Sequence, residues 1–217
     1  HSVVLAGSGW NTELKCTGNS DCIRLENSHF CVVKDLLLSA AGKQTSGSGI
    51  VLRNCSSSVV SFCRIDGFPV SGIRFEGIRE TPMSSNTVRD CHLIGNRDAQ
   101  LFSRNNNDFY IVGNQFGTHG AHPRAGSVLD CSSAGTYSMN YHWGNGVALQ
   151  LGPQANFNRI EDNRFEESDR SGILMVGGPN GESSMRNIVT GNTIHTNSKQ
   201  KTGGFSAVEA HNAIDVI

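Results

Sequence analysis

Short apolar runs recur along this chain, and Cys or Asn interrupts each of them at a fixed place. Each run has an apolar residue, two further residues, Cys or Asn, one residue, and a second apolar residue. The copies occupy residues 60–65, 88–93, 111–116, 160–165 and 189–194, so successive copies begin 28, 23, 49 and 29 residues apart. Repeats of this length are typical of solenoids, in which each repeat packs only on its neighbours.

A second run, Gly followed by three mostly apolar residues, precedes most of these copies. It occurs at Gly49–Leu52, Gly72–Phe75, Gly146–Leu149 and Gly172–Met175. Both runs are short, are separated by Gly, Asn and Ser turns, and lack helical spacing, which predicts β-strands. We therefore expect an all-β fold: a single-stranded parallel β-helix of about eight rungs, with three short strands in each rung.

Alternation along the strands assigns their faces. In the first strand of a rung, Ile50 and Leu52 should point inward and Val51 and Arg53 outward. A tight bend is expected at the interrupting residue, where Asn tolerates a left-handed backbone and can bond to the Asn of the next rung. The residues at this bend are Cys63, Cys91, Asn114, Asn163 and Asn192. Their predicted role is structural.

Seven cysteines do not indicate a disulfide framework, because the number is odd and the chain is not small. Cys63 and Cys91 should stack as inward thiols one turn apart. Since neighbouring strands lie about 4.8 Å apart, a disulfide between them is also geometrically possible. Cys16 and Cys22 are a second candidate pair.

The three-strand rung with Asn at a tight bend resembles the pectate-lyase-like superfamily of right-handed parallel β-helices, as does the opening segment Val3–Leu14. This superfamily includes phage tailspikes and polysaccharide depolymerases. The resemblance covers nearly the whole chain and implies a right-handed coil, a polysaccharide substrate, a homotrimer and a location on a virion tail or outside the cell. It implies no cofactor.

Charge and hydropathy exclude other partners. The formal net charge is −1, so no basic field attracts nucleic acid, and no apolar run is long enough for membrane insertion. The chain starts at His1, and strand-like runs stand at both ends, so we expect one domain, 1–217, cut from a longer polypeptide. Segments 117–145 and 195–212 are expected to be long return loops over the substrate groove.

Segment 117–145 concentrates residues that could carry β-elimination on a uronic acid. This reaction needs a cation for the carboxylate, a base and an acid. Arg124 is the candidate cation, His119, His122 and His142 are candidate bases, and Tyr137 and Tyr141 are candidate acids. Trp143 offers a flat face for a sugar ring. A uronan C5-epimerase would use a similar set.

Glycoside hydrolysis is the alternative reaction and needs two carboxyl groups. The candidates are Asp130, Glu166, Glu167 and Asp169. Outward groups on the first strands should line the groove floor and bind substrate: Arg53, Arg74, Glu76 and Gln150, with Asp169 and Trp143 beside them. No metal site is assigned, because His119 and His122 lie on a Gly-rich segment and not on a fixed helix face. A non-catalytic glycan-binding or structural fibre domain is the alternative class of function.

Overall fold

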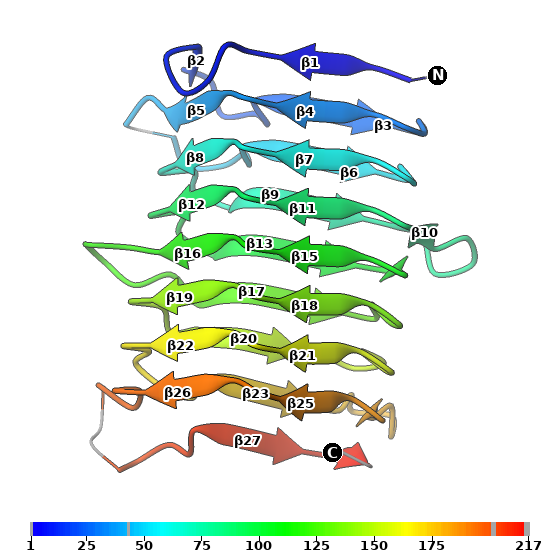
Figure 1. Ribbon diagram of the computed structural model, residues 1–217, viewed down its shortest axis with the longest axis vertical. Coiled ribbons are helices and arrows are strands. Elements are labelled where there is room, and N and C mark those ends of the chain that lie inside the picture. Colours follow the sequence, from blue (N-terminus) through cyan, green and yellow to red (C-terminus); the bar gives the residue numbers. More distant parts are fainter. Residues whose placement is uncertain (1, 43, 201–202, 215–217) are drawn as a thin grey trace.

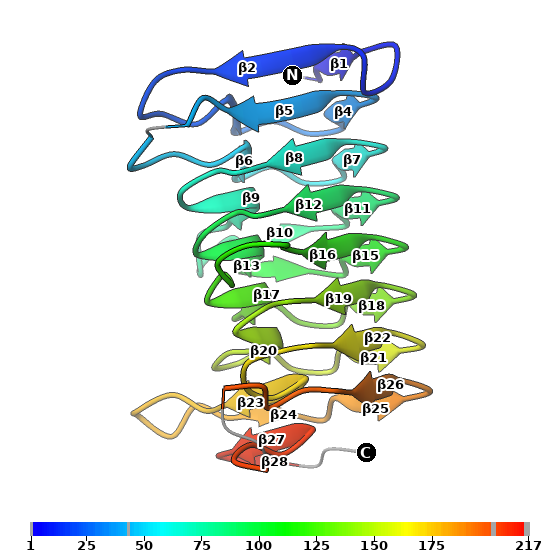
Figure 2. The same ribbon diagram turned by 90° about the vertical axis from the view of Figure 1, so that its left-hand side faces the viewer.

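The computed structural model describes residues 2–42, 44–200 and 203–214, and within them the chain is a coil of short strands without helices. Three parallel sheets of eight strands each form the sides of the coil (Figures 1 and 2). This confirms the predicted all-β parallel β-helix with three strands per rung. None of the described segments is a helix long and apolar enough to cross a membrane.

We name the three sheets A, B and C in the order in which a rung visits them. Sheet A contains β1 (Val4–Ala6), β4 (Val32–Lys34), β7 (Val59–Ser61), β11 (Thr87–Arg89), β15 (Tyr110–Val112), β18 (Thr136–Ser138), β21 (Arg159–Glu161) and β25 (Ile188–Thr190). Sheet B contains β2 (Glu13–Cys16), β5 (Leu37–Ala40), β8 (Arg64–Asp66), β12 (His92–Ile94), β16 (Gln115–Gly117), β19 (Tyr141–Trp143), β22 (Arg164–Glu166) and β26 (Thr193–His195).

Sheet C holds the first strands of the sequence prediction. It contains β3 (Ile23–Glu26), β6 (Ile50–Arg53), β9 (Ser71–Glu76), β13 (Ala99–Arg104), β17 (Ala125–Asp130), β20 (Val147–Leu151), β23 (Ile173–Val176) and β27 (Val208–His211). Two small parallel pairs lie at the corner between sheets C and A: β10 (Met83–Ser84) with β14 (Asn106–Asn107), and β24 (Ser184–Met185) with β28 (Ala213–Ile214).

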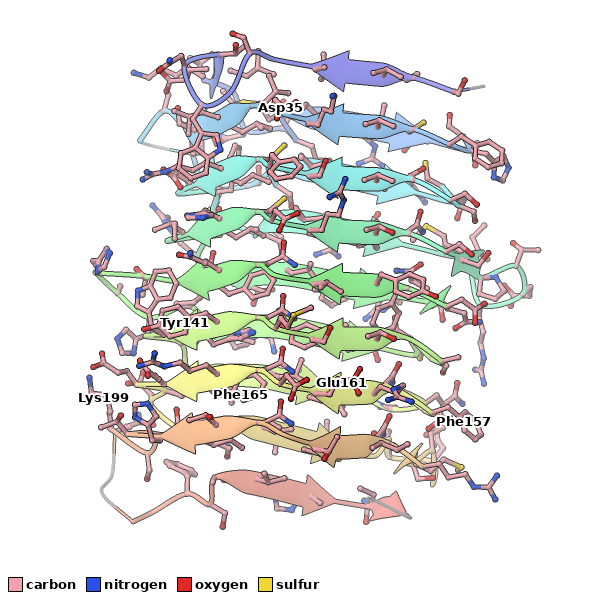
Figure 3. All side chains as sticks on the ribbon, in the orientation of Figure 1. Asp35, Tyr141, Phe157, Glu161, Phe165 and Lys199 are labelled. Carbon is pink, nitrogen blue, oxygen red and sulfur yellow. A yellow bond between two sulfur atoms is a disulfide. The ribbon has the colours of Figure 1, made fainter. Side chains whose placement is uncertain are left out.

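The core fills the inside of the coil, because equivalent inward residues of successive turns stack on one another. On sheet B the middle residue of each strand points inward, and this row includes Leu38, Ile65, Leu93, Phe116 and Phe165, all fully buried (Phe165 is labelled in Figure 3). On sheet C, Ile50 and Leu52 point inward and Arg53 is exposed, as predicted. Val51 belongs to the outer face but is buried between Arg24 and Arg74 of the adjacent strands.

The predicted Asn ladder runs along the corner between sheets A and B. The side-chain amides of Asn114, Asn140 and Asn163 each donate to the Oδ1 atom of the next Asn, over 2.9–3.1 Å, and the ladder ends at Asn192. The expected left-handed backbone falls one residue earlier, at positions such as Asp90, Gly113 and Asp162. The Asn side chain must point inward to reach the next turn, so the preceding residue makes the bend.

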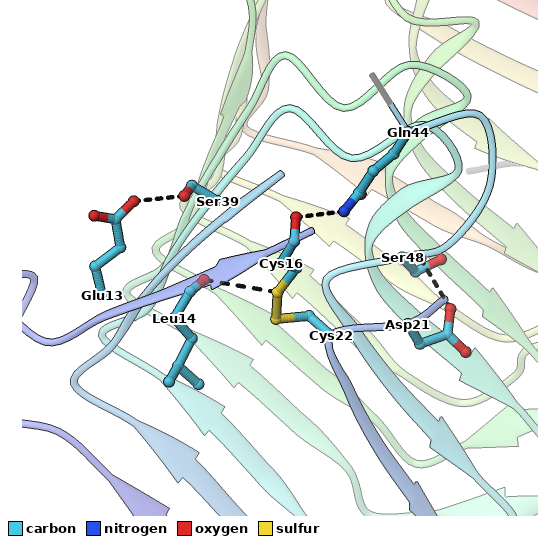
Figure 4. Close-up of a disulfide and its surroundings, with 8 residues drawn as sticks. All are labelled: Glu13, Leu14, Cys16, Asp21, Cys22, Ser39, Gln44 and Ser48. Atoms are coloured by element: carbon cyan, nitrogen blue, oxygen red, sulfur yellow. Dashed lines mark hydrogen bonds between the residues drawn. A yellow bond between two sulfur atoms is a disulfide. The ribbon is translucent and has the colours of Figure 1, made fainter. Parts of the chain in front are cut away.

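The cysteines divide into one bonded pair and five free thiols. Cys63 and Cys91 stack inside the coil, both buried and both free. Cys16 and Cys22 form a disulfide in the connection between β2 and β3, where Gln44 donates to the Cys16 carbonyl (Figure 4). Of the two candidate pairs, Cys16 and Cys22 are therefore the bonded one.

Segment 117–145 is not a long return loop, contrary to the prediction. It contains β17, β18 and β19, which form a complete turn, and the return loop proper covers only residues 118–124. The missed copy of the repeat is Tyr137–His142, with Asn140 at the ladder position. The register also aligns Ala148–Leu151 with Gly172–Met175, so the predicted run at Gly146 is displaced by two residues.

The second predicted loop, 195–212, is shorter than expected. Strand β26 ends at His195 and β27 occupies Val208–His211, so the connection covers residues 196–207. Residues 201–202 lie outside the described residues, as do 215–217 of the strand expected at the C-terminal end. The described part of that strand is β28.

Candidate functional site

The outer face of sheet C carries the predicted groove-floor residues, but they are engaged with one another. Arg74 bonds to Glu76 on its own strand, and its guanidinium lies 4.5 Å from the centre of the Phe102 ring. Arg53 lies 3.9 Å from Glu26 on the adjacent strand. Paired charges of both signs and apolar groups thus cover this face, where Phe102, Val128 and two alanines form a small cluster separate from the main core.

Two further candidates also form ion pairs on or near sheet C. Asp130 ends β17 and accepts a 2.7 Å hydrogen bond from Arg104. Arg124 donates to Asp98 over 2.8 Å at the corner between sheets B and C, and also approaches Gln150. Of the candidate hydrolase carboxylates, Asp130 thus belongs to sheet C, whereas Glu166 ends β22 on sheet B.

Tyr137 and His142, both predicted catalytic residues, lie inside the coil and are fully buried. The Tyr137 hydroxyl bonds to Ser127 over 2.8 Å and to His142 Nε2, so one polar group from each sheet of this turn meets in the core. Burial lowers the pKa of His142 to about 3 and raises that of Tyr137. Since substrate cannot reach them, neither residue can act on a polysaccharide.

The neighbouring residues of the same turn face outward on sheet B. Tyr141 and Trp143 flank His142, and their rings lie 5.1 Å apart at 30° to each other. The Trp143 ring lies flat on Gly117 of the preceding turn, where a Cβ atom would stand 2.2 Å from the ring. Gly117 thereby makes room for an aromatic platform on the sheet.

Glu166, one turn further, is the carboxylate beside this platform. Its residue is only 7% exposed, it accepts a 2.8 Å hydrogen bond from the Tyr141 hydroxyl, and it contacts Arg164 and His195. Burial acts to raise the pKa of Glu166, but the bonds from Tyr141 and Arg164 and the nearby cations outweigh it and lower the pKa. Burial and the carboxylate together raise the pKa of Tyr141, so Glu166 is ionised and Tyr141 protonated.

These groups surround a pocket of about 390 Å³ on the outer face of sheet B. Its lining residues are Gln115, His119, Tyr141, Trp143, Glu166 and Glu167. Figure 3 shows Tyr141 and Lys199 on this side of the coil, and Lys199 Nζ lies 3.1 Å from Glu167. The pocket brings together five of the predicted site residues: His119, Tyr141, Trp143, Glu166 and Glu167.

His122 and Asp169 stand apart from the pocket, at the corner between sheets B and C. Their side chains lie 2.9 Å apart, and they join the return loop after β16 to the one after β22. The pair links two turns of the coil across an intervening one. Neither residue lines the pocket.

Sequence reasoning missed Gln115, Arg164, His195 and Trp10. The first two follow the Asn of the ladder directly, a position that the repeat itself marks as outward on sheet B. Trp10, from the connection between β1 and β2, contacts His92 with ring centres 4.7 Å apart and so lies over earlier turns of sheet B. Trp10 lies in a connection that the repeat does not cover, so its place on sheet B could not be read from the repeat.

Coil and ladder together define a right-handed parallel β-helix protein. The family model described as "Periplasmic copper-binding protein (NosD)" matches residues 4–206, and the chain belongs to this family. No curated protein sequence matches the chain.

Solved structures with the same fold include enzymes and an adhesin. The enzymatically active domain of bacteriophage CBA120 tailspike protein 2 superposes with a TM-score of 0.77 at 13% identity, over 98% of this chain and 35% of that one. PfbA, a surface adhesin of Streptococcus pneumoniae, gives 0.54 at 12% identity, over 91% and 59%. The A-module of the Azotobacter vinelandii mannuronan C-5 epimerase AlgE6 gives 0.52 at 14%, over 95% and 63%. The chain thus spans about a third of the tailspike's length, and at these identities the likeness shows the fold alone.

Proposed function

We propose that this chain is the glycan-acting part of a polysaccharide-degrading protein and that it hydrolyses a glycosidic bond in the sheet B pocket. One observation carries the proposal: a buried, ionised carboxylate, Glu166, stands beside the aromatic platform of Tyr141 and Trp143. Aromatic faces pack on the apolar faces of sugar rings. A carboxylate at such a platform is where glycoside hydrolysis places one of its two acidic groups.

The two glutamates take different roles in this mechanism. Glu166 is held ionised by Tyr141 and Arg164, which suits a base or nucleophile. Glu167 lines the same pocket and is half exposed, so it is the candidate for the second carboxyl group that the reaction needs. Tyr141 positions Glu166 through its hydroxyl and presents its ring to the sugar.

Hydrolysis is favoured over β-elimination by the distribution of cations. A uronate carboxylate needs a free cation, but Arg164 and His195 contact Glu166, Lys199 pairs with Glu167, and Arg124 pairs with Asp98. Two glutamates would also repel the uronate. A lyase or uronan C5-epimerase is the second candidate, because His119 and Tyr141 line one pocket and can supply a base and an acid.

The family description names copper, so the donor groups of the chain bear on that function. Copper sites use imidazole, thiolate and thioether ligands. Within residues 2–42, 44–200 and 203–214, no three His, Cys, Asp or Glu side chains come together in a way that could hold a metal ion. Cys63 and Cys91 are free, buried thiols that donate hydrogen bonds to backbone carbonyls inside the core. The donor set does not fit copper, and no step here uses it.

A homotrimer remains a proposal, and the outer face of sheet A supports it. Val4, Tyr110 and Ile188 lie on this face and are 68%, 52% and 38% exposed. Exposed apolar side chains that share one face favour association. Light scattering should give three times the chain mass; a monomer at micromolar concentration would contradict the trimer.

A location outside the cytosol, on a virion tail or extracellular, is also proposed. The Cys16–Cys22 disulfide supports it, since structural disulfides persist mainly in oxidising surroundings. Thiol titration of the denatured chain isolated from its native source should find five free cysteines. Seven free thiols would contradict this location.

A screen of acidic and neutral polysaccharides tests the reaction. We expect new reducing ends without an unsaturated, ultraviolet-absorbing product, and we expect Trp143→Ala to raise KM by about tenfold. Unsaturated product would identify a lyase instead. Binding without cleavage, abolished by Trp143→Ala, would identify a non-catalytic glycan-binding module, and neither binding nor cleavage would overturn the proposal.

A further inference from the structure

A second hollow lies at the corner between sheets C and A, away from the sheet B pocket. Figure 3 shows Phe157, which belongs to this corner, on the opposite side of the coil from Tyr141. Two loops project here, residues 77–82 before β10 and residues 177–183 before β24 (Figures 1 and 2). Between them is a groove of about 450 Å³.

The floor of the groove is a column of polar turn residues. The Ser133 amide N–H bonds to Asn107 Oδ1, the Asn156 N–H to Ser133 Oγ, and the Met185 N–H to Asn156 Oδ1, over 3.3, 3.3 and 2.9 Å. These bonds fix which end of each amide faces the neighbouring turn. The NH₂ groups of Asn107 and Asn156 take no part in the bonds of this column.

These amide groups have no partner in the part of the chain that the structure describes. The same holds for the side-chain amide of Gln154, which lines the groove one turn from Ser133. None of the three is among the buried polar atoms that lack partners, so they face solvent. Two turns of the coil, separated by the turn that holds Ser133, therefore present side-chain amides that the fold does not use.

The two ends of the groove differ in charge. Arg79, in the first loop, is exposed and makes no ion pair within the described residues. Glu182, in the second loop, accepts a hydrogen bond from the backbone N–H of Asn180. With strands about 4.8 Å apart, the five turns from one loop to the other span roughly 19 Å. The groove thus suits an extended ligand that is rich in acceptors and has an anionic group at the Arg79 end.

We propose that this groove is a second, non-catalytic binding site for an acidic oligosaccharide, with a sugar carboxylate at Arg79 and hydroxyl groups on the amides of Asn107, Gln154 and Asn156. Guanidinium groups bind carboxylates through paired hydrogen bonds. Glu182 is the only carboxyl group in the lining, so the paired carboxylates of a hydrolase are absent from these described residues. Binding here does not depend on catalysis in the sheet B pocket.

Cys131 provides a reporter for this site. It lines the groove, and it is half-buried, whereas the other four free cysteines among the described residues are buried. The experiment measures alkylation of Cys131 by iodoacetamide with an oligomannuronate or oligogalacturonate tetrasaccharide, and with maltotetraose as the neutral probe. We expect at least one acidic probe to slow alkylation in a saturable way and the neutral probe to leave it unchanged.

Variants assign the protection to the groove. Arg79→Ala should weaken the protection by about tenfold and Gln154→Ala by about threefold. The effect at Arg79 is larger because a hydrogen bond from a charged group is stronger than one from a neutral amide. Arg89→Ala, at an exposed arginine on sheet A, is the matched control and should change nothing. Trp143→Ala should also leave the protection intact.

Three results would overturn the inference. One is the absence of protection by either acidic probe. Another is equal protection by maltotetraose that Arg79→Ala does not weaken. The third is loss of protection in Trp143→Ala, which would place the bound sugar on sheet B.

Discussion

Along the outer face of sheet C, one register position alternates in charge from turn to turn: Glu26, Arg53, Glu76, Arg104 and Asp130. Arg104 and Asp130 lie 2.7 Å apart, and Arg53 and Glu26 lie 3.9 Å apart. Because stacked positions repeat about every 4.8 Å, each charge meets an opposite one beside it. The charged side chains of this face thus pair with one another, and few of them are left to bind a ligand.

Sheet B uses the same stacking differently. Side chains from three successive turns, Tyr141, Arg164 and His195, all converge on Glu166. The Glu166 carboxylate lines an open pocket, whereas the carboxylates of sheet C belong to a row of alternating charges. The comparison shows that the coil spaces side chains equally on both faces, and that a site arises where several turns direct their groups at one atom.

The largest effect that the comparison predicts is on activity. Glu166→Gln removes the ionised carboxylate and should lower kcat by about 1,000-fold with little change in fold, as loss of a catalytic group does. Glu76→Gln, at an outward carboxylate on sheet C, is the matched control and should stay within about twofold of wild type. Reducing-end release on the substrate found by the screen measures both. Equal losses in the two variants would place the site on both sheets.

Most of the coil could be predicted from the sequence, because inward positions must be apolar and the repeat spaces them evenly. The prediction failed at one turn, where Ser127, Tyr137 and His142 stand in inward positions. Because these inward positions hold polar residues, the sequence pattern predicted a loop instead of strands. They are tolerated because the three side chains bond to one another, which only the closed coil reveals.

The same error moved the candidate site. Tyr137 and His142 were grouped with Tyr141 and Trp143 by closeness in sequence, but strand alternation puts the first pair inside and the second outside. Alternation predicted the outward placement of Arg53 and Glu76 on sheet C, since their run was recognised. It could not predict that Arg164 and His195 converge on Glu166, because side-chain direction within a face is set by packing.

The next largest expected effect is on the pH dependence of stability, and it comes from His142 on the interior side of this turn. The pKa of His142 is about 3 in the fold, against about 6.5 for an unfolded histidine, so protonation favours unfolding. The stability that its neutral form provides is complete above pH 6.5 and is lost as the pH falls toward 3. Between pH 7 and pH 4 this group should cost the fold about 3 kcal/mol.

His142→Phe tests that expectation, because Phe116 and Phe165 occupy the same inward row on the adjacent turns. The unfolding free energy from urea titration should fall between pH 7 and pH 4 by about 3 kcal/mol less in the variant than in wild type. At pH 7 the variant should keep its activity near that of wild type. An identical pH dependence, or a thousandfold loss of activity, would show that His142 is accessible.

The platform gives a smaller effect on binding. Gly117→Val places a side chain where the Trp143 ring lies, so the ring must leave the sheet and affinity for the glycan should fall by about tenfold. Gly120→Ala is the control, because its added Cβ has only Thr118 Oγ1 nearby, at 3.9 Å. Calorimetric titration with the glycan measures both. Unchanged affinity in Gly117→Val would remove Trp143 from the site.

The smallest effect is expected on sheet C, and it tests whether that face is indeed self-satisfied. Arg104 is half exposed and pairs with Asp130 at the surface, so Arg104→Gln should lower the unfolding free energy by only about 0.5 kcal/mol. Arg104→Glu should lower the unfolding free energy by more, about 1 kcal/mol, because it places a third acidic group between Glu76 and Asp130 on the adjacent turns. Added salt should reduce the difference in stability between the two variants. Neither should change activity by more than about twofold. Thermal unfolding at low and high salt measures the stability, and a tenfold loss of activity in Arg104→Gln would make sheet C part of the binding surface.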